Sequence, residues 1–411
     1  MSARIPELLS PAGNARKLKV AYDYGADAAY IGVSPFSLRK ACEGESADSE
    51  ISKPVGKKLY GALNMLFYDQ DITLLEQMAP QLGKVPYDAF IVSDLGAARV
   101  LRERLPDVDL HLSTQSSCMN SRAVREYASL GFKRIILGRE ASIDDIRRIK
   151  DKAGDIEIEV FVHGAMCMAV SGRCLLSAAL SARSGNRGDC TQPCRWKYRL
   201  ALEEESRPGQ YMPFFEDGNF STILSSRDLC MINHLQDLVD AGVDSLKIEG
   251  RMKSMYYVAV VTRSYRHMLD AVLCPDASAR MEKVADCGKY VSELENVSHR
   301  EYTTGFFYGD ERYGFSPARG NYISNYRFLG VVGKRKSPGV FEVEAKYKIE
   351  KGQTIELIGP EVFSIAISDF VIYDQEMNEK NQANINSISY LKFGDCDSGL
   401  IREGFLIRGR I

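Results

Sequence analysis

Short apolar runs rich in β-branched residues alternate with amphipathic stretches from about residue 5 to about residue 270. This alternation predicts parallel strands joined by helices. Eight runs are predicted as strands: Glu7–Ala12, Ala28–Val33, Lys58–Met65, Ala89–Asp94, Asp109–Gln115, Arg134–Arg139, Ile156–Gly164 and Ser245–Arg251. Ser221–Ser225 is a further candidate. About eight such units favour an α/β fold of the (β/α)₈ TIM-barrel type, with a doubly wound open sheet as the alternative.

Polar residues near the predicted strand ends are candidates for an active site, because barrel enzymes place their sites at the carboxyl ends of the strands. They are Ser10, Asn64, Ser93, His111, Gln115, Arg139, Glu140, His163, Glu249 and Arg251. We predict catalytic or substrate-binding roles for Glu249, Arg251 and His111. Arginine suits a dicarboxylate because its fork pairs with a carboxylate at two points. Two other interpretations stay open: Glu249 and Arg251 form a structural ion pair, or His111 is a barrel-core histidine.

Three further segments complete the predicted organisation. The alternation of apolar runs and amphipathic stretches is interrupted between about residues 165 and 230. This interruption predicts an insertion on the catalytic face of a domain spanning residues 1–270. Residues 271–320 form a connector. From residue 321 to 411 apolar residues recur with period two between turns, which predicts a small C-terminal antiparallel β-barrel.

The composition excludes some classes of protein. The net charge of −2 exerts no strong general attraction on nucleic acid, so RNA binding requires a local basic patch. The N-terminal residues lack the apolar core of a signal peptide, and no apolar run is long enough to cross a membrane. We therefore expect a cytoplasmic protein with no membrane partner. Disulfides are rare in that compartment, so the chain's ten cysteines direct attention to metal binding.

The insertion gathers thiols. Cys167, Cys174, Cys190 and Cys230 are the predicted ligands of a [4Fe-4S] cluster, which needs four thiolates. Cys194 could replace Cys190, and Cys230 stands at the start of a predicted helix. Structural zinc and free thiols remain alternatives, although only Cys190 and Cys194 have a spacing usual for zinc. The other cysteines are expected to be ordinary thiols: Cys42, Cys118, Cys274, Cys287 and Cys396.

A basic run with interleaved aromatic residues follows the central cysteines. It comprises Arg183, Arg187, Arg195, Lys197 and Arg199 with Trp196 and Tyr198. Arginine beside aromatic rings suits phosphate contact and base stacking on single-stranded RNA, and we predict RNA contacts for Arg195, Trp196 and Arg199. A solvated basic surface is the alternative. Lys334, Arg335 and Lys336 are expected to be ordinary turn residues.

Several motifs resemble peptidase family U32, the collagenase-like family. They are EVFVHGAMC at Glu159–Cys167, GRCLLS at Gly172–Ser177, ELLSPAGN near the start, FSLR at Phe36–Arg39, HLSTQ at His111–Gln115, SSRDLC ending at Cys230, LKIEGRMKS at Leu246–Ser254 and TTGFFYG at Thr303–Gly309. Together with the C-terminal β domain, the resemblance covers nearly the whole chain. It is greatest to the branch that hydroxylates the wobble uridine of certain tRNAs to 5-hydroxyuridine in a prephenate-dependent reaction.

That resemblance implies an iron–sulfur-dependent tRNA uridine hydroxylase, with tRNA as partner and prephenate as cosubstrate. One sister branch hydroxylates a ribosomal-RNA cytidine, and another supports ubiquinone hydroxylation. The resemblance to the ubiquinone branch implies the four cluster ligands named above and a second family member as a possible partner. The electron donor is not implied.

Proteolysis is the alternative function. The sequence contains neither HExxH nor GxSxG. His163 stands four residues before Cys167, one turn away in a helix, which allows a Cys–His dyad. An iron-bound cysteine cannot be a nucleophile, so the two functions exclude each other at Cys167.

Overall fold

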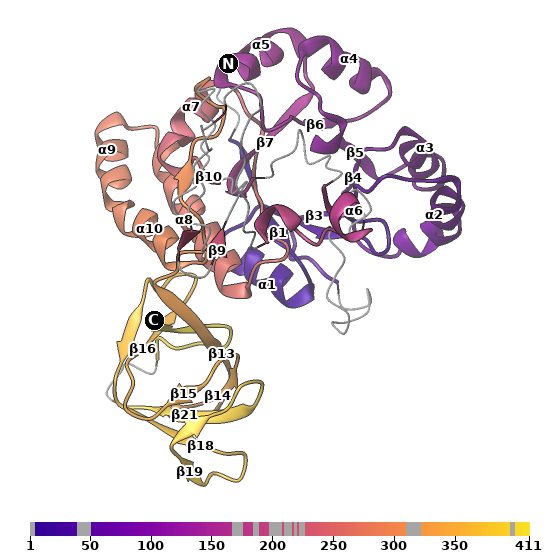
Figure 1. Ribbon diagram of the computed structural model, residues 1–411. Coiled ribbons are helices and arrows are strands. Elements are labelled where there is room, and N and C mark those ends of the chain that lie inside the picture. Colours follow the sequence, from indigo (N-terminus) through magenta and orange to yellow (C-terminus); the bar gives the residue numbers. More distant parts are fainter. Residues whose placement is uncertain are drawn as a thin grey trace.

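The larger domain is a closed barrel of eight parallel strands (Figure 1). The computed structural model describes residues 5–38, 51–166, 176–183, 189–196, 208, 216–217, 220–221, 227–309, 322–394 and 399–411. The barrel strands are β1 (Glu7–Ala12), β2 (Ala28–Gly32), β3 (Lys58–Leu63), β4 (Ala89–Val92), β5 (Asp109–Leu112), β6 (Arg134–Ile136), β7 (Glu157–Ala165) and β11 (Ser245–Ile248). Because β11 pairs with both β1 and β7, the barrel prediction is confirmed and the open sheet is excluded.

Helices surround the barrel, and capped N-termini begin several of them. The helices are α1 (Ala15–Asp23), α2 (Asp69–Leu82), α3 (Leu95–Arg104), α4 (Ser121–Ser129), α5 (Ile143–Ala153), α7 (Leu235–Asp240) and α8 (Met255–Val272). Side-chain oxygens accept N-terminal backbone N–H groups at Asn14, Asp94, Asn120, Ser142 and Ser254. Such caps satisfy donors that have no partner within the helix. Among the described helices, none is long and apolar enough to cross a membrane.

Two short strands extend the barrel sheet beyond β7. β10 (Asp228–Cys230) pairs antiparallel with the end of β7, and β12 (Tyr302–Thr303) pairs with β10. Cys230 therefore ends a strand. The prediction that it begins a helix was wrong. The described parts of the predicted insertion are α6 (Leu176–Ser181), a 3₁₀ turn (Pro193–Arg195), β8 (Glu216–Asp217) and β9 (Phe220–Ser221). The further strand candidate was Ser221–Ser225. Ser221 belongs to β9, which pairs with β8 and not with the barrel, and residues 222–225 lie outside the described ranges.

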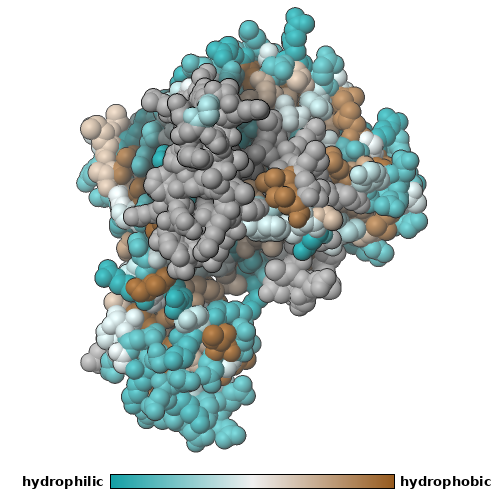
Figure 2. Space-filling model, viewed as in Figure 1, coloured by the Kyte–Doolittle hydropathy of each residue, from teal (hydrophilic) through white to brown (hydrophobic). Residues whose placement is uncertain are grey.

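Residues 271–320 carry regular structure where they are described, namely α9 (Ala277–Asp286), α10 (Gly288–Glu293) and β12. The predicted C-terminal antiparallel domain is confirmed as a curled sheet in the order β17-β16-β22-β13-β14-β21-β18-β19. These strands are β13 (Tyr326–Ser337), β14 (Val340–Ala345), β16 (Ile355–Ile358), β17 (Ile365–Ile367), β18 (Phe370–Tyr373), β19 (Glu379–Lys380), β21 (Ile388–Phe393) and β22 (Leu406–Arg410). β15 (Ile349–Glu350) pairs with β20 (Gln382–Ala383). The visible surface of this domain is largely hydrophilic (Figure 2).

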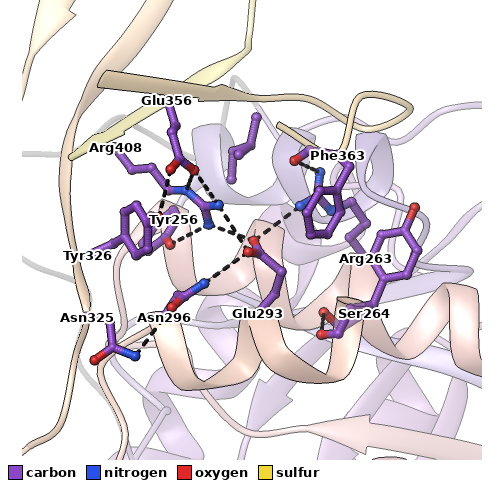
Figure 3. A network of polar contacts seen from close by, with 12 residues as sticks. Tyr256, Arg263, Ser264, Glu293, Asn296, Asn325, Tyr326, Glu356, Phe363 and Arg408 are labelled. Atoms are coloured by element: carbon purple, nitrogen blue, oxygen red, sulfur yellow. Dashed lines mark hydrogen bonds and ion pairs between the residues drawn. The ribbon is translucent and has the colours of Figure 1, made fainter. Parts of the chain in front are cut away.

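A buried network of charges joins the two domains (Figure 3). Arg408 on β22 donates to both carboxylate oxygens of Glu293 on α10, at 2.6 and 3.0 Å, and to Glu356 on β16 at 2.7 Å. Arg263 on α8 donates to the backbone carbonyls of Gly359 and Val362 at 2.7 and 2.8 Å. Because Arg408, Glu293 and Arg263 are buried, the network fixes the C-terminal domain on the barrel helices.

Candidate functional site

An ion pair lies at the carboxyl end of the barrel. Glu249 follows β11 and Arg139 follows β6, and their side chains meet at 3.0 Å. Arg139 also donates to the carbonyl of Ala165 at 2.5 Å, and its guanidinium lies 3.9 Å from the ring centre of Phe161. The ends of β6, β7 and β11 therefore all help to position Arg139. Glu249 pairs with Arg139 and not with Arg251, the ion-pair partner considered from the sequence.

Gly164, near the end of β7, allows the backbone of Glu249 to lie close to that strand. Its φ is +105°, and a Cβ there would lie 2.4 Å from the carbonyl oxygen of Glu249. The backbone N–H of Glu249 donates to the carbonyl of His163 at 2.8 Å, which continues the ladder past the end of β11. Any other residue at 164 would be strained and would displace Glu249.

Arg251 occupies a tight, buried position close to the same end of the barrel. Its Nη1 donates to the hydroxyl of Ser37 at 2.6 Å, and its guanidinium lies 5.7 Å from the ring centre of Tyr30. A Cβ at Gly32 would lie 2.8 Å from Nη1, and one at Gly13 would lie 2.4 Å from the carbonyl oxygen of Arg251. Ser37 and Tyr30 therefore hold the guanidinium of Arg251 in one place, and its binding of a carboxylate stays a prediction.

His111 lies in a different part of the barrel. Its ring packs edge-on against Tyr60, with centroids 4.7 Å apart, next to Arg134 in the strand ladder. It lines a cavity of about 520 Å³ at the amino ends of the strands, together with Lys58 and Glu157. Burial, helped by the charge of Arg134, holds the pKa of His111 well below its usual range.

The barrel interior between these two ends is ionic. Arg134 contacts Glu7 at 2.6 Å and Glu159 at 3.1 Å, and Lys247 contacts Glu159 at 2.7 Å. The structure thus places His111 beside this interior network and does not bring it to the pair formed by Glu249 and Arg139. Its catalytic role stays a prediction.

The candidate cluster region begins where β10 meets β7. Cys230 lies opposite His163 in the ladder. Burial raises the pKa of the Cys230 thiol to about 11 and lowers the pKa of His163 to about 3. At the other end of β10, buried Asp228 forms an ion pair with Arg300 at 2.6 Å. The protein environment alone therefore keeps Cys230 a neutral thiol, and a bound cation would be needed to hold it as thiolate.

The described thiols fit an iron–sulfur site by their chemistry. Cys190 is exposed and accepts the backbone N–H of Gln192 at 3.4 Å, and Cys194 is half-buried in the 3₁₀ turn. Cys167 and Cys174 lie outside the described residues, as do Cys42 and Cys396. Within the described ranges, no three His, Cys, Asp or Glu side chains gather as a metal site. The four-ligand set and the choice between Cys190 and Cys194 stay predictions.

The predicted RNA-binding residues are described only in part. Trp196 is 40% exposed, and its indole N–H donates to the carbonyl of Thr191 at 3.0 Å. Arg195 ends the 3₁₀ turn, and Arg199 lies outside the described residues. Arg183 forms an exposed ion pair with Asp189, which reduces the charge available at that point of the basic run. The exposed ring of Trp196 is compatible with stacking.

Sequence reasoning missed several residues at these sites. Ser37 and Tyr30 hold Arg251, and Tyr265 on α8 lies beside Cys230. Arg139 stood among the strand-end residues, so its position was a usable signal, but nothing in its neighbourhood identified Glu249 as its partner. Tyr265 lies in the apolar face of a helix and carried no signal of its own.

The predicted Cys–His dyad needs correction. The one-turn spacing of His163 and Cys167 assumed a helix, whereas His163 belongs to the strand β7. Its Nδ1 lies 3.3 Å from the hydroxyl of Tyr265, and Cys167 lies outside the described residues. The helical argument for a nucleophile and base at these positions therefore no longer holds.

Comparison with known proteins covers both domains. Residues 13–315 match peptidase family U32, and residues 324–408 match the U32 C-terminal domain. The chain is 35% identical over 399 residues to tRNA hydroxylation protein P1 of Bacillus subtilis, covering 94% of this chain and 91% of that protein. It is 35% identical to tRNA hydroxylation protein P of Escherichia coli, covering 87% and 86%. It is 30% identical to a collagenase of Porphyromonas gingivalis, covering 86% of each chain.

Proposed function

The chain belongs to peptidase family U32, and from that premise we propose that it is an RNA-modifying enzyme that hydroxylates a tRNA wobble uridine to 5-hydroxyuridine, with prephenate as cosubstrate. The observation that carries the proposal is the similarity to a tRNA hydroxylation protein along 94% of the chain. Similarity of this extent includes both the barrel and the C-terminal domain.

The carboxyl end of the barrel supplies groups suited to the cosubstrate. Arg251, held by Ser37, presents a permanent positive charge with a geometry that matches a carboxylate. Arg139 keeps Glu249, two residues before Arg251, in a fixed orientation through their ion pair. A dicarboxylate entering the barrel mouth would meet Arg251, while Glu249 orients polar groups of the substrate.

Cys167, Cys174, Cys190 and Cys230 would hold a [4Fe-4S] cluster, which supplies one-electron chemistry when bound. The electron donor and a possible second family member are partners for which the chain gives no specific residue.

The RNA would be held by charge and stacking. Trp196 offers an exposed ring for stacking, and Arg195 and Arg199 would contact phosphates. We expect these contacts to hold the anticodon loop of the tRNA. Because the proposed substrate is a tRNA, we also expect the protein to act in the cytoplasm.

The proposal can be tested by mass analysis of tRNA nucleosides. A strain that lacks the gene should lose 5-hydroxyuridine and its derivatives, and the wild-type chain should restore them. Supply of prephenate should be required for the restoration. Unchanged nucleosides in the deletion strain would contradict the proposal.

Proteolysis is the second candidate, supported by the similarity to the collagenase. Purified protein with and without iron should be incubated with denatured collagen. Cleavage by the iron-free chain that disappears in Cys167→Ala would support a peptidase, since a metal-bound thiolate cannot attack a peptide bond.

A further inference from the structure

The hydroxyl of Tyr265 lies at the point where β10 ends on β7. Tyr265 belongs to α8 and is fully buried. Its hydroxyl oxygen lies 2.8 Å from the carbonyl oxygen of Val162 and 3.1 Å from the backbone nitrogen of Met231. It also lies 3.3 Å from Nδ1 of His163 and 3.9 Å from the sulfur of Cys230. One side chain therefore contacts the backbone on both sides of the strand pair and the sulfur at its end.

The hydroxyl of Tyr265 can turn towards the sulfur without leaving a backbone group unsatisfied. The backbone N–H of Met231 donates to the carbonyl of Val162 at 2.9 Å as well as to Tyr265. The Val162 carbonyl thus accepts a second bond from the hydroxyl of Tyr265. If that hydroxyl turns to the sulfur, the carbonyl keeps its bond from Met231, so no buried backbone group is left unsatisfied.

Packing fixes the distance between the ring and the sulfur. The ring of His163 contacts Tyr265 edge-on, with centroids 5.4 Å apart, and also contacts Tyr302 at 5.4 Å and Tyr257 at 6.0 Å. All of these rings are buried except that of Tyr302, which is half-buried. Only rotation of the hydroxyl is needed to redirect the proton, because the ring itself has no space to move.

We propose that Tyr265 is a positioning residue for the sulfur of Cys230: it holds the end of β10 against β7 and donates a hydrogen bond from its hydroxyl to that sulfur when the sulfur is an iron-bound thiolate. The inference rests on the proposed function, in which Cys230 is a cluster ligand. A thiolate is a better acceptor than a neutral thiol, so the redirected bond favours the metal-bound form. Hydrogen bonds to ligand sulfurs are among the factors that set the reduction potential of such clusters.

The test compares Tyr265→Phe with Tyr302→Phe in the full-length protein. Both substitutions remove one hydroxyl from the rings around His163, but the hydroxyl of Tyr302 donates to the carbonyl of Leu294 at 2.9 Å, whereas that of Tyr265 lies 3.9 Å from the sulfur of Cys230. Iron content after reconstitution, the rate of iron loss to a chelator and the midpoint potential are measured. We expect Tyr265→Phe to lose iron roughly ten-fold faster than the wild type and to have a lower potential. Tyr302→Phe should match the wild type in both measurements.

If both variants bind iron and behave alike, the inference is overturned while the proposed function stands. If the wild type binds no iron, the cofactor of the proposed function fails and the inference fails with it. Should Tyr265→Phe not fold, 3,5-difluorotyrosine at position 265 replaces it as the test. Its hydroxyl is a stronger donor of the same shape, so the potential should rise; an unchanged potential would again overturn the inference.

Discussion

Glu249 forms its ion pair with Arg139, 110 residues away in the sequence, at a distance of 3.0 Å. Arg251, two residues from Glu249, donates instead to Ser37. The two arginines at the barrel mouth are therefore held by different partners, and substitutions can separate a role in orientation from a role in binding.

Replacing Arg251 with lysine should reduce hydroxylation while leaving the fold intact. Lysine keeps the positive charge but lacks the planar guanidinium, so it cannot pair with a carboxylate at two points or keep the bond to Ser37 in the same geometry. Loss of one charge-assisted hydrogen bond should lower the activity roughly 10- to 100-fold. The variant's activity per folded molecule and its KM for prephenate should be measured, with Ser37→Ala as the control for the lost anchor. A lower Tm with unchanged activity would instead make Arg251 a structural residue.

The cluster ligands can be assigned by iron content. Alanine at Cys167, Cys174, Cys190 or Cys230 should abolish iron binding, because each removes one of four thiolates. Cys194→Ala is the matched control and should retain iron. Full iron in Cys190→Ala with none in Cys194→Ala would move the ligand to Cys194, and zinc in place of iron in the wild type would contradict the cluster.

RNA binding should depend on Arg195 and Arg199. The double substitution Arg195→Ala, Arg199→Ala should weaken tRNA binding and reduce the slope of log affinity against log salt by about 1 to 2, since each phosphate contact releases counterions. Filter binding over a salt series measures this. Lys334→Ala, Lys336→Ala removes the same charge from the C-terminal domain and should have a smaller effect; equal effects would argue for general attraction.

The domain interface should depend on Arg408. Arg408→Met leaves the buried carboxylate of Glu293 with less compensation, and loss of one partner of a buried pair costs about 3 to 5 kcal/mol. Denaturation by urea should show this loss, and adding Glu293→Leu should recover part of it. Arg410→Met, an exposed change on the same strand, should alter stability little. A small effect of Arg408→Met would show that the interface does not depend on the network.

Acidification should destabilise the chain partly through His111. Burial holds its folded pKa well below the unfolded value of about 6.5, so below that pH the unfolded state binds a proton that the folded state does not. The free energy of unfolding should fall by about 1.4 kcal/mol per pH unit from this group until the folded pKa is reached. His111→Gln should remove this contribution and leave that of His163, whose folded pKa is also lowered by burial, whereas His234→Gln, at a partly exposed position, should leave both. Loss of hydroxylation at pH 7.5 in the folded His111→Gln variant would support the predicted catalytic role.

The sequence predicted the barrel because each strand is a short apolar run, but it placed several strand ends too late. The run at Lys58–Met65 continues past Leu63, and the run at Ser245–Arg251 continues past Ile248, although the ladder ends at those residues. Strand ends depend on where the neighbouring strand stops, which one sequence window does not contain. The strand Asp228–Cys230 was missed for the same reason, because three residues become a strand only through pairing with β7.

Contacts between distant elements were the least predictable part of the site. Spacing along the chain directed attention to Glu249 and Arg251, whereas closure of the barrel brings Arg139 to Glu249. Ser37 and Tyr265 are ordinary in their local sequence, and only the fold gives them a partner.

The last barrel strand to be synthesised is also the one that closes the barrel. β11 lies between β7 and β1, so β1 has no partner on one edge until residues 245–248 have emerged from the ribosome. All of the predicted ligand cysteines precede these residues in the chain. The segment that carries them therefore leaves the ribosome while the barrel is still open, and closure of the barrel is a late event in the protein's assembly.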